Sequence, residues 1–111
     1  MIETIVLDYL KTNKGLAVYM EQPKTKPSAF YLLEKTAGGQ TDKINTSTFV
    51  VQSYATTLYD AALMNETVKA AMADLINLDA VSRVELNSDY NYTDPTTKQY
   101  RYQAVFVLTH Y

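Results

Sequence analysis

Residues 88–111 constrain the fold of this chain more than any other stretch. They read SDYNYTDPTTKQYRYQAVFVLTHY and contain five of the ten tyrosines. Apolar and polar side chains alternate on both sides of the dipeptide Asp94-Pro95, and alternation at every second residue is typical of a half-buried strand. Asp and Pro are residues that favour turns. The stretch therefore predicts a closing β-hairpin, with residues 81–92 as one strand and residues 99–111 as the other.

The same alternation predicts which side chains of the hairpin share a face. In a strand, every second side chain points to the same side of the sheet. This rule puts Arg101 and Gln103 on one face. The opposite face receives the tyrosines together with apolar side chains that belong in a core: Leu86, Tyr90, Tyr92, Tyr100, Tyr102 and Phe106. We therefore expect these tyrosines to pack beneath helices.

Two segments have the residue spacing of helices. Residues 2–13 repeat apolar side chains every three or four positions, and Gly15 is a natural helix end because glycine readily takes the left-handed conformation. Residues 58–78 form the longer segment, and Thr57 and Asp60 before and inside it resemble an N-terminal capping box. The expected inward side of this long helix consists of Ala61, Met64, Val68, Met72, Leu75 and Ile76.

Three segments before the long helix predict strands. Residues 16–20, 29–36 and 46–55 are rich in β-branched, aromatic and other apolar side chains. Residues 37–45 contain a Gly-Gly pair among polar side chains, which predicts a hairpin loop. The predicted order is helix, three strands, long helix, two strands. It indicates an α+β fold, a two-layer sandwich in which helices cover an antiparallel sheet of about five strands, formed as a single domain over residues 1–111.

The sequence offers little material for catalysis or for a metal site. Because the chain has no cysteine, zinc sites of the Cys type and thiol nucleophiles are excluded. Its single histidine, His110, lies at the end of the last predicted strand, where we expect a poor general base. Asp89, Asn91 and Asp94 have the spacing of the start of a calcium loop, but Thr93 and Asp94 occupy positions where that loop needs Asp or Asn and then Gly. We therefore expect no enzyme activity, no cofactor and no metal.

Charge and hydropathy exclude further classes. A net charge of -2 does not suit sequence-specific nucleic-acid binding, which usually shows as a clustered basic excess. The apolar runs, such as residues 104–108, are too short to cross a membrane. Two readings of the tyrosine-rich hairpin remain, namely ordinary cross-strand pairing and a protein interface. For an interface, the expected contact residues are Asp94, Pro95, Lys98, Tyr100, Arg101 and Gln103.

Three stretches of the chain carry a resemblance to a known group of proteins. They are MIETIVLDYLK at the start, FVVQSYATTLYDAALMNETVKAAM in the middle and SDYNYTDPTTKQYRYQAVFVLTHY at the end. In their residue patterns and in the order of helices and strands they resemble the tail-terminator and head–tail joining proteins of long-tailed phages and prophages of Gram-positive bacteria. No catalytic motif takes part in this resemblance, so no functional residue is carried over.

The resemblance implies a non-enzymatic minor structural protein of the virion tail or neck, synthesised in the cytoplasm of the host bacterium. Tail terminators cap the finished tail tube and present a surface to the head connector, and they act as closed rings, usually hexamers. The implied partners are further copies of the chain, the major tail tube protein and head-completion proteins. Two other hypotheses stand beside it: a small intracellular binding or regulatory module that uses the hairpin, and a hydrolase or transferase with an unusual polar pocket.

Overall fold

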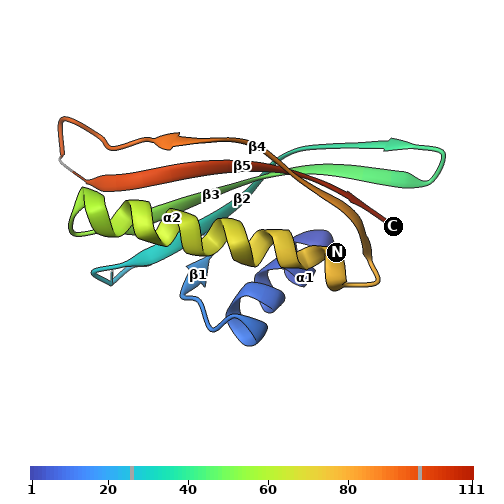
Figure 1. Ribbon diagram of the computed structural model, residues 1–111, viewed down its shortest axis with the longest axis horizontal. Helices are drawn as coiled ribbons and strands as arrows, with labels where there is room; N and C mark the ends of the chain where they lie inside the picture. The colour runs from blue at the N-terminus through green and yellow to red at the C-terminus, as the bar shows by residue number, and fades with distance from the viewer. Residues whose placement is uncertain (26, 98) are drawn as a thin grey trace.

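A computed structural model describes residues 1–25, 27–97 and 99–111 (Figure 1). It confirms the α+β fold class and the predicted order of helices and strands. The elements are α1 (Ile2–Asp8), η1 (Tyr9–Asn13), β1 (Val18–Tyr19), β2 (Phe30–Thr41), β3 (Ile44–Ala55), α2 (Leu58–Ala73), η2 (Asp74–Asn77), β4 (Val81–Asn91) and β5 (Tyr100–His110). In this set η1 is a short π-helical continuation of α1, and η2 is a 3-10 turn that follows α2.

The five strands form one sheet in the order β1-β2-β3-β5-β4. The pairs β2–β3, β3–β5 and β4–β5 are antiparallel, as expected, whereas β1 runs parallel to β2. The expectation of a wholly antiparallel sheet is wrong at this one pair, because the connection between β1 and β2 is not a tight turn. Residues of this connection reach the side of the sheet that has no helix, where Gln22 donates a hydrogen bond to the Tyr54 hydroxyl (3.1 Å).

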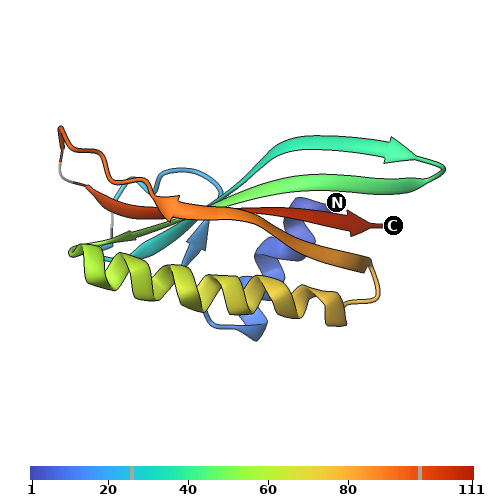
Figure 2. The same cartoon turned by 45° about the horizontal axis from the view of Figure 1, so that its top comes forward.

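Both helices cover the same side of the sheet, and the other side has no helical layer (Figures 1 and 2). The main core lies between the helices and the covered side, and a second, smaller buried cluster of Phe30, Leu32 and Tyr54 lies on the other side. Phe49 and Phe106 are directly paired across β3 and β5, and both are fully or almost fully buried there. The helices contribute the opposing surface of this core: Ile2, Val6, Leu10, Val68, Ala71, Met72 and Leu75.

Helix α2 begins as predicted and ends earlier than predicted. The Thr57 hydroxyl oxygen accepts a hydrogen bond from the backbone N–H of Asp60 (3.1 Å), which satisfies one of the free donors of the first turn. The α-helix ends at Ala73, and the chain then tightens into η2. A 3-10 turn has about three residues per turn instead of 3.6, so the inward stripe of the helix is not continued. Ile76, expected in the core, is accordingly exposed.

The segment at residues 37–45 is a hairpin arm and not the predicted loop. Strand β2 continues to Thr41, and Gly38 and Gly39 are paired with residues of β3. The turn itself consists of Asp42 and Lys43, which both have positive φ angles (51° and 68°). Two successive residues with positive φ match the right-handed twist of the flanking strands in a tight hairpin. The prediction of the turn at the Gly-Gly pair is therefore wrong.

The position of Leu75 gives a test of this core. Leu75 is fully buried where η2 follows α2, so replacing it with alanine leaves a cavity. We expect Leu75→Ala to lower the free energy of unfolding by about 2–4 kcal/mol. Leu63→Ala on the exposed side of α2 is the control, and we expect a change of less than about 1 kcal/mol there. Urea denaturation measures both values, and equal effects of the two substitutions would contradict the assigned inward side.

Candidate functional site: the open face of the sheet

A β-bulge in β4 decides which side chains reach the side of the sheet without helices. Leu86 is paired with Phe106, but the next pair is Ser88 with Val105, so Asn87 is an extra residue in β4. One extra residue moves every later side chain to the opposite face. Residues 83–86, which lie between this bulge and a second irregularity after Val81, keep the predicted orientation, and the residues after Asn87 reverse.

Asp89 is turned toward α2 by this bulge. Its carboxylate oxygens lie 3.4 Å from the side-chain amide of Asn65, which donates to it, and 3.3 Å from the ammonium group of Lys69. Lys69 also contacts Glu66 at 2.9 Å. The hydrogen bond to Glu66, and then that to Asp89, raise the pKa of the Lys69 ammonium above its ordinary value. These contacts hold the part of β4 beyond the bulge against the helix.

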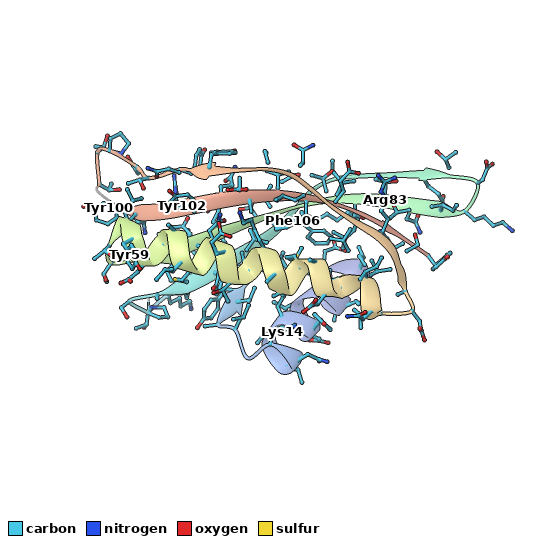
Figure 3. The ribbon with its side chains drawn as sticks, viewed as in Figure 1. Lys14, Tyr59, Arg83, Tyr100, Tyr102 and Phe106 are labelled. Carbon is cyan, nitrogen blue, oxygen red and sulfur yellow. The ribbon has the colours of Figure 1, made fainter. Side chains whose placement is uncertain are left out.

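The tyrosines of the closing hairpin are split between the two faces. Tyr100 and Tyr102 are an even number of positions away from Phe106 along β5, so they face the helix side as Phe106 does (Figure 3). Tyr90 and Tyr92 lie beyond the bulge and face the other side, with their rings edge-to-face at a centroid distance of 5.9 Å. The prediction that all four tyrosines share one face is therefore wrong, because parity counting from Leu86 does not include the extra residue.

Arg101 is fixed by contacts with other residues of the chain. Its guanidinium carbon lies 4.6 Å from the ring centroid of Tyr92 and 5.7 Å from that of Tyr54. Nε donates to the backbone carbonyl of Tyr92 (2.7 Å), and Nη1 donates to the Tyr54 hydroxyl (3.0 Å). A planar cation with several donors can stack on aromatic rings and donate hydrogen bonds at once. Arg101 is thus a rigid part of the surface.

A chain of neutral hydrogen bonds continues from Arg101 across the strands. The Tyr54 hydroxyl donates to Gln52 (2.7 Å), and the Gln52 amide donates to Gln103 (2.8 Å). The Gln103 amide then donates to the hydroxyl of Tyr90. Linked side chains of this kind rigidify one another. The surface therefore has a preformed polar end.

Three valines form an apolar centre next to this polar network. Val50 and Val105 are direct partners across β3 and β5, and Val107 is the next residue of β5 on the same face, opposite Thr48. All three valines are half-buried, and no helix covers them. We define the open sheet face as this surface as a whole: Val50, Gln52, Tyr90, Tyr92, Arg101, Gln103, Val105 and Val107.

The Asp94-Pro95 turn closes the hairpin, as predicted. Asp94 forms an isolated bridge with Gln99, and its side chain accepts a hydrogen bond from the backbone N–H of Thr96 (2.9 Å). This hydrogen bond is the main cause that lowers the pKa of the Asp94 carboxyl below its ordinary value. Pro95 is exposed beside it. The two residues lie at the tip of the hairpin, at one end of the open sheet face.

The structure brings together only some of the expected contact residues. Arg101 and Gln103 share the open sheet face, as predicted, and Asp94 and Pro95 lie at its end. Tyr100 points to the helix side instead, and Lys98 lies outside the described residues. Sequence reasoning missed the three valines and the two tyrosines beyond the bulge. The apolar character of both faces of the chain after residue 104 was the signal for the valines.

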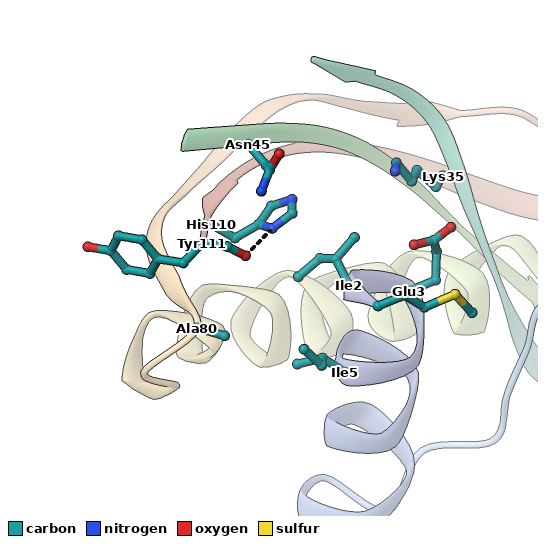
Figure 4. A pocket seen from close by; sticks show the side chains of 9 residues that line it. Ile2, Glu3, Ile5, Lys35, Asn45, Ala80, His110 and Tyr111 are labelled. Atoms are coloured by element: carbon teal, nitrogen blue, oxygen red, sulfur yellow. Dashed lines mark hydrogen bonds between the residues drawn. The ribbon is translucent and has the colours of Figure 1, made fainter. Parts of the chain in front are cut away.

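His110 is buried and forms a hydrogen bond with a serine hydroxyl. It is 7% exposed, and its Nε2 shares a hydrogen bond of 2.8 Å with the hydroxyl of Ser47, which is itself buried. A hollow of about 360 Å³ lies beside it, with Glu3 and Lys35 in its lining (Figure 4). The other contact of the imidazole is with the backbone carbonyl of Tyr111 (3.3 Å), not with a carboxylate. A nucleophile must reach its substrate, and the buried Ser47 hydroxyl cannot.

Other types of site are not assembled by the described residues. In residues 1–25, 27–97 and 99–111, no group of three or more His, Cys, Asp or Glu side chains is placed to hold a metal ion. Four hollows lined by these residues contain at most one carboxylate side chain each. No helix in the described part of the chain is long and apolar enough to span a membrane.

No model of a protein family matches the chain, and no curated protein matches it. The open sheet face therefore has to be interpreted from its own chemistry.

The contacts of Arg101 predict a measurable contribution to stability. Arg101→Ala removes a charged donor from the buried Tyr54 hydroxyl and a cation from two aromatic rings, and we expect it to lower the free energy of unfolding by about 1–2 kcal/mol. Arg83→Ala is the matched control, because Arg83 is mostly exposed and makes only a 3.5 Å contact with Glu85. We expect a change of no more than about 0.5 kcal/mol there. Thermal and urea denaturation compare the two variants, and equal losses would show that Arg101 is not held in this way.

Deletion of Asn87 tests the bulge. Because Asn87 is the extra residue, its deletion leaves a regular ladder in which Ser88 stays opposite Val105 and Asp89 stays opposite Ala104. We expect this variant to keep the contacts of Asp89 with Asn65 and Lys69 and the nuclear Overhauser contacts between Tyr90 and Gln103. Deletion of Asn87 together with Ser88 removes one residue more, so Asp89 would point to the open sheet face and Tyr90 toward the helix, and we expect a markedly less stable protein without these contacts. Loss of the contacts in the single deletion would contradict the assigned role of the bulge.

Proposed function

We propose that this protein is a non-enzymatic structural subunit of a long-tailed phage or prophage, which caps the tail tube and joins it to the head connector as a subunit of a ring. The observation that carries the proposal is the open sheet face, a preformed surface with an apolar centre and a polar aromatic end. The resemblance of the three sequence stretches to tail-terminator and joining proteins supplies the biological setting. The proposed partners are other copies of the chain, the tail tube protein and head-completion proteins.

The composition of the open sheet face suits a protein contact. Interface cores are apolar and enriched in tyrosine and arginine, and their rims are polar. Val105 and its neighbours supply the apolar part, while Tyr90, Tyr92 and Arg101 supply the aromatic and cationic part. Because Arg101 and the glutamines are already held by hydrogen bonds, little side-chain freedom is lost on association. A surface of this kind supports assembly more than it supports chemistry.

The shape of the subunit also suits assembly. Its principal extents are 45 × 25 × 24 Å, and the hairpin arm of β2 and β3 and the closing hairpin of β4 and β5 lie at opposite ends of the long axis (Figure 1). An elongated subunit can contact a neighbour along its side and reach the rings above and below with its ends. This agrees with a subunit that joins two different structures, the tube and the connector.

A small intracellular binding module is the second candidate function, since the same open sheet face could receive a host protein. Both candidate functions use the open sheet face, and they differ in the protein that binds to it. A pull-down with the purified protein distinguishes them. Tight capture of a host protein without any tail component would favour the regulatory module.

Electron microscopy of isolated tails is the direct test of the proposal. We expect density of this protein at the head-proximal end of the tail tube and none along its length. Tyr92→Ala, which removes an exposed ring from the open sheet face, is expected to reduce the fraction of tails that carry the density. Lys11→Ala is the control, because Lys11 is exposed on η1, on the side of the sheet that carries the helices. We expect this substitution to leave that fraction unchanged. Absence of density at that end with the unaltered protein would contradict the proposal.

A further inference from the structure

Strand β4 is the last strand of the sheet order, and its outer edge has no partner strand among the described residues. Two irregularities interrupt its pairing with β5, one after Val81 and one after Leu86. Residues 83–86 form the regular stretch between them. An edge strand exposes a row of backbone N–H and C=O groups that can pair with a further strand. Residues 83–86 are therefore a short edge that can accept another strand.

The hydrogen bonds of β5 indicate which backbone groups of β4 point outward. The Arg101 carbonyl accepts a hydrogen bond from the backbone N–H of Tyr92 (2.9 Å). The Thr109 carbonyl accepts one from the Ser82 hydroxyl (3.1 Å). In an antiparallel pair, backbone groups point alternately toward one neighbouring strand and toward the other. The odd-numbered residues of β5 therefore direct their N–H and C=O groups toward β4.

Val84 and Leu86 turn their own backbone groups to the free edge. Glu85 is paired with Val107, an odd-numbered residue of β5, so the N–H and C=O of Glu85 point inward. By the same alternation, those of Val84 and Leu86 point outward. The side chains of these two residues lie on the helix side, where Leu86 is 44% exposed. Free backbone groups and apolar side chains thus belong to the same two residues.

A hollow of about 170 Å³ lies beside these two residues, on the helix side. It is lined by Lys69, Ala73, Val84, Leu86 and Phe106. Ala73 contributes only a methyl group, which leaves space between α2 and β4. A cavity of about 150 Å³ with apolar walls takes up benzene. We name this hollow the β4 socket, and its volume suits one large apolar side chain.

The charged groups around the β4 socket are paired with one another. The Lys69 ammonium group contacts Glu66 (2.9 Å) and Asp89 (3.3 Å). Asp89 also accepts a hydrogen bond from the Asn65 amide (3.4 Å). Because the ammonium group is held in this way, the hydrocarbon stem of Lys69 is the part that can contact an apolar ligand. A hydrocarbon side chain that enters the β4 socket leaves these polar contacts intact.

From these observations we propose that β4 accepts an extended segment of a partner protein as a sixth strand beside the five of the sheet, and that the β4 socket receives one large apolar side chain of this segment. Backbone hydrogen bonds to Val84 and Leu86 hold the segment, and the socket selects its side chain, as is general for strand addition. A residue directly opposite Val84 has its side chain on the same, helix side. The inference goes beyond the proposed function, because the open sheet face takes no part in it.

The open side of the same edge defines the neighbours of the socket residue. Arg83 and Glu85 have side chains that are 70% and 57% exposed, and their 3.5 Å contact is of the weak, solvent-exposed kind. In an antiparallel added strand, one residue lies opposite Glu85, the next opposite Val84 and the next opposite Arg83. Opposite charges directly across a sheet are favourable, and like charges are not. The fitting segment therefore reads basic residue, large apolar residue, acidic residue.

Titration of the isotope-labelled protein with a blocked peptide tests the site by NMR. The peptide acetyl-TKFET-amide has the three residues in the required order between two threonines, which favour strands. We expect the amide signals of Val84 and Leu86 to shift and their exchange with deuterium to slow. The amides of Arg83 and Glu85 already point toward β5 and are expected to change less.

Two substitutions separate the β4 socket from the backbone edge. The peptide with alanine in place of phenylalanine is expected to bind about tenfold more weakly, because it leaves the socket unfilled. Ala73→Leu fills the socket from α2 and is expected to weaken binding of the phenylalanine peptide by about the same factor. Ala70→Leu is the control, since Ala70 is exposed on the same helix and does not line the hollow. Unchanged urea midpoints confirm that both variants fold.

Three results would overturn the proposal. The first is the absence of shifts at Val84 and Leu86 with the peptide in millimolar excess. The second is equal binding of the phenylalanine and alanine peptides. The third is slowed exchange of the same two amides in the concentrated protein alone, because the added strand would then be a second copy, which has the required charges around Val84 but only a valine for the socket. None of these results depends on the electron microscopy of tails.

Discussion

The cross-strand pair of Phe49 and Phe106 is the contact on which the rest of the structure depends. Both rings are buried beneath the helices, and their burial fixes the register between β3 and β5. A slip of either strand by one residue would move its phenylalanine ring to the uncovered side, so this register is strongly specified. The same register places Val50 opposite Val105 and Gln52 opposite Gln103 on the other face. The core on one side of the sheet therefore determines the chemistry of the open sheet face on the other.

The bulge at Asn87 extends this arrangement to β4. Before the bulge, Leu86 faces the helix side beside Phe106. After it, Asp89 faces the helix side and Tyr90 faces the open side. The reversal gives Asp89 its contacts with α2 and gives Arg101 an aromatic ring to stack on. One extra residue thus links the packing of the helix to the composition of the candidate interface.

Much of the fold follows from local patterns in the sequence, and the exceptions have identifiable causes. The order of elements, the Thr57 cap and the Asp94-Pro95 turn depend on neighbouring residues, and the structure confirms them. The bulge at Asn87 was not predictable, because it is settled by the distant partners Asn65 and Lys69 of Asp89. The Gly-Gly pair misled the prediction because pairing with β3 outweighs the turn preference of glycine.

The candidate site was predictable to a smaller extent than the fold. Simple alternation was enough to separate Arg101 and Gln103 from the core, since β5 has a regular register with β3. The same counting failed for Tyr90 and Tyr92 because it continued through the bulge. Val105 and Val107 became relevant only once the structure showed helices on one side of the sheet, as a run that is apolar on both faces equally suits a buried strand.

Methyl NMR of the protein with labelled valines tests the central proposal, that the protein binds its partner through the open sheet face. The labelled protein is titrated with tail tubes that lack it. The account predicts shifts or broadening of the methyl signals of Val50, Val105 and Val107, while the buried Val51 and Val68 remain unchanged. Binding that leaves the signals of the open sheet face unaffected and perturbs only other methyl groups would contradict it.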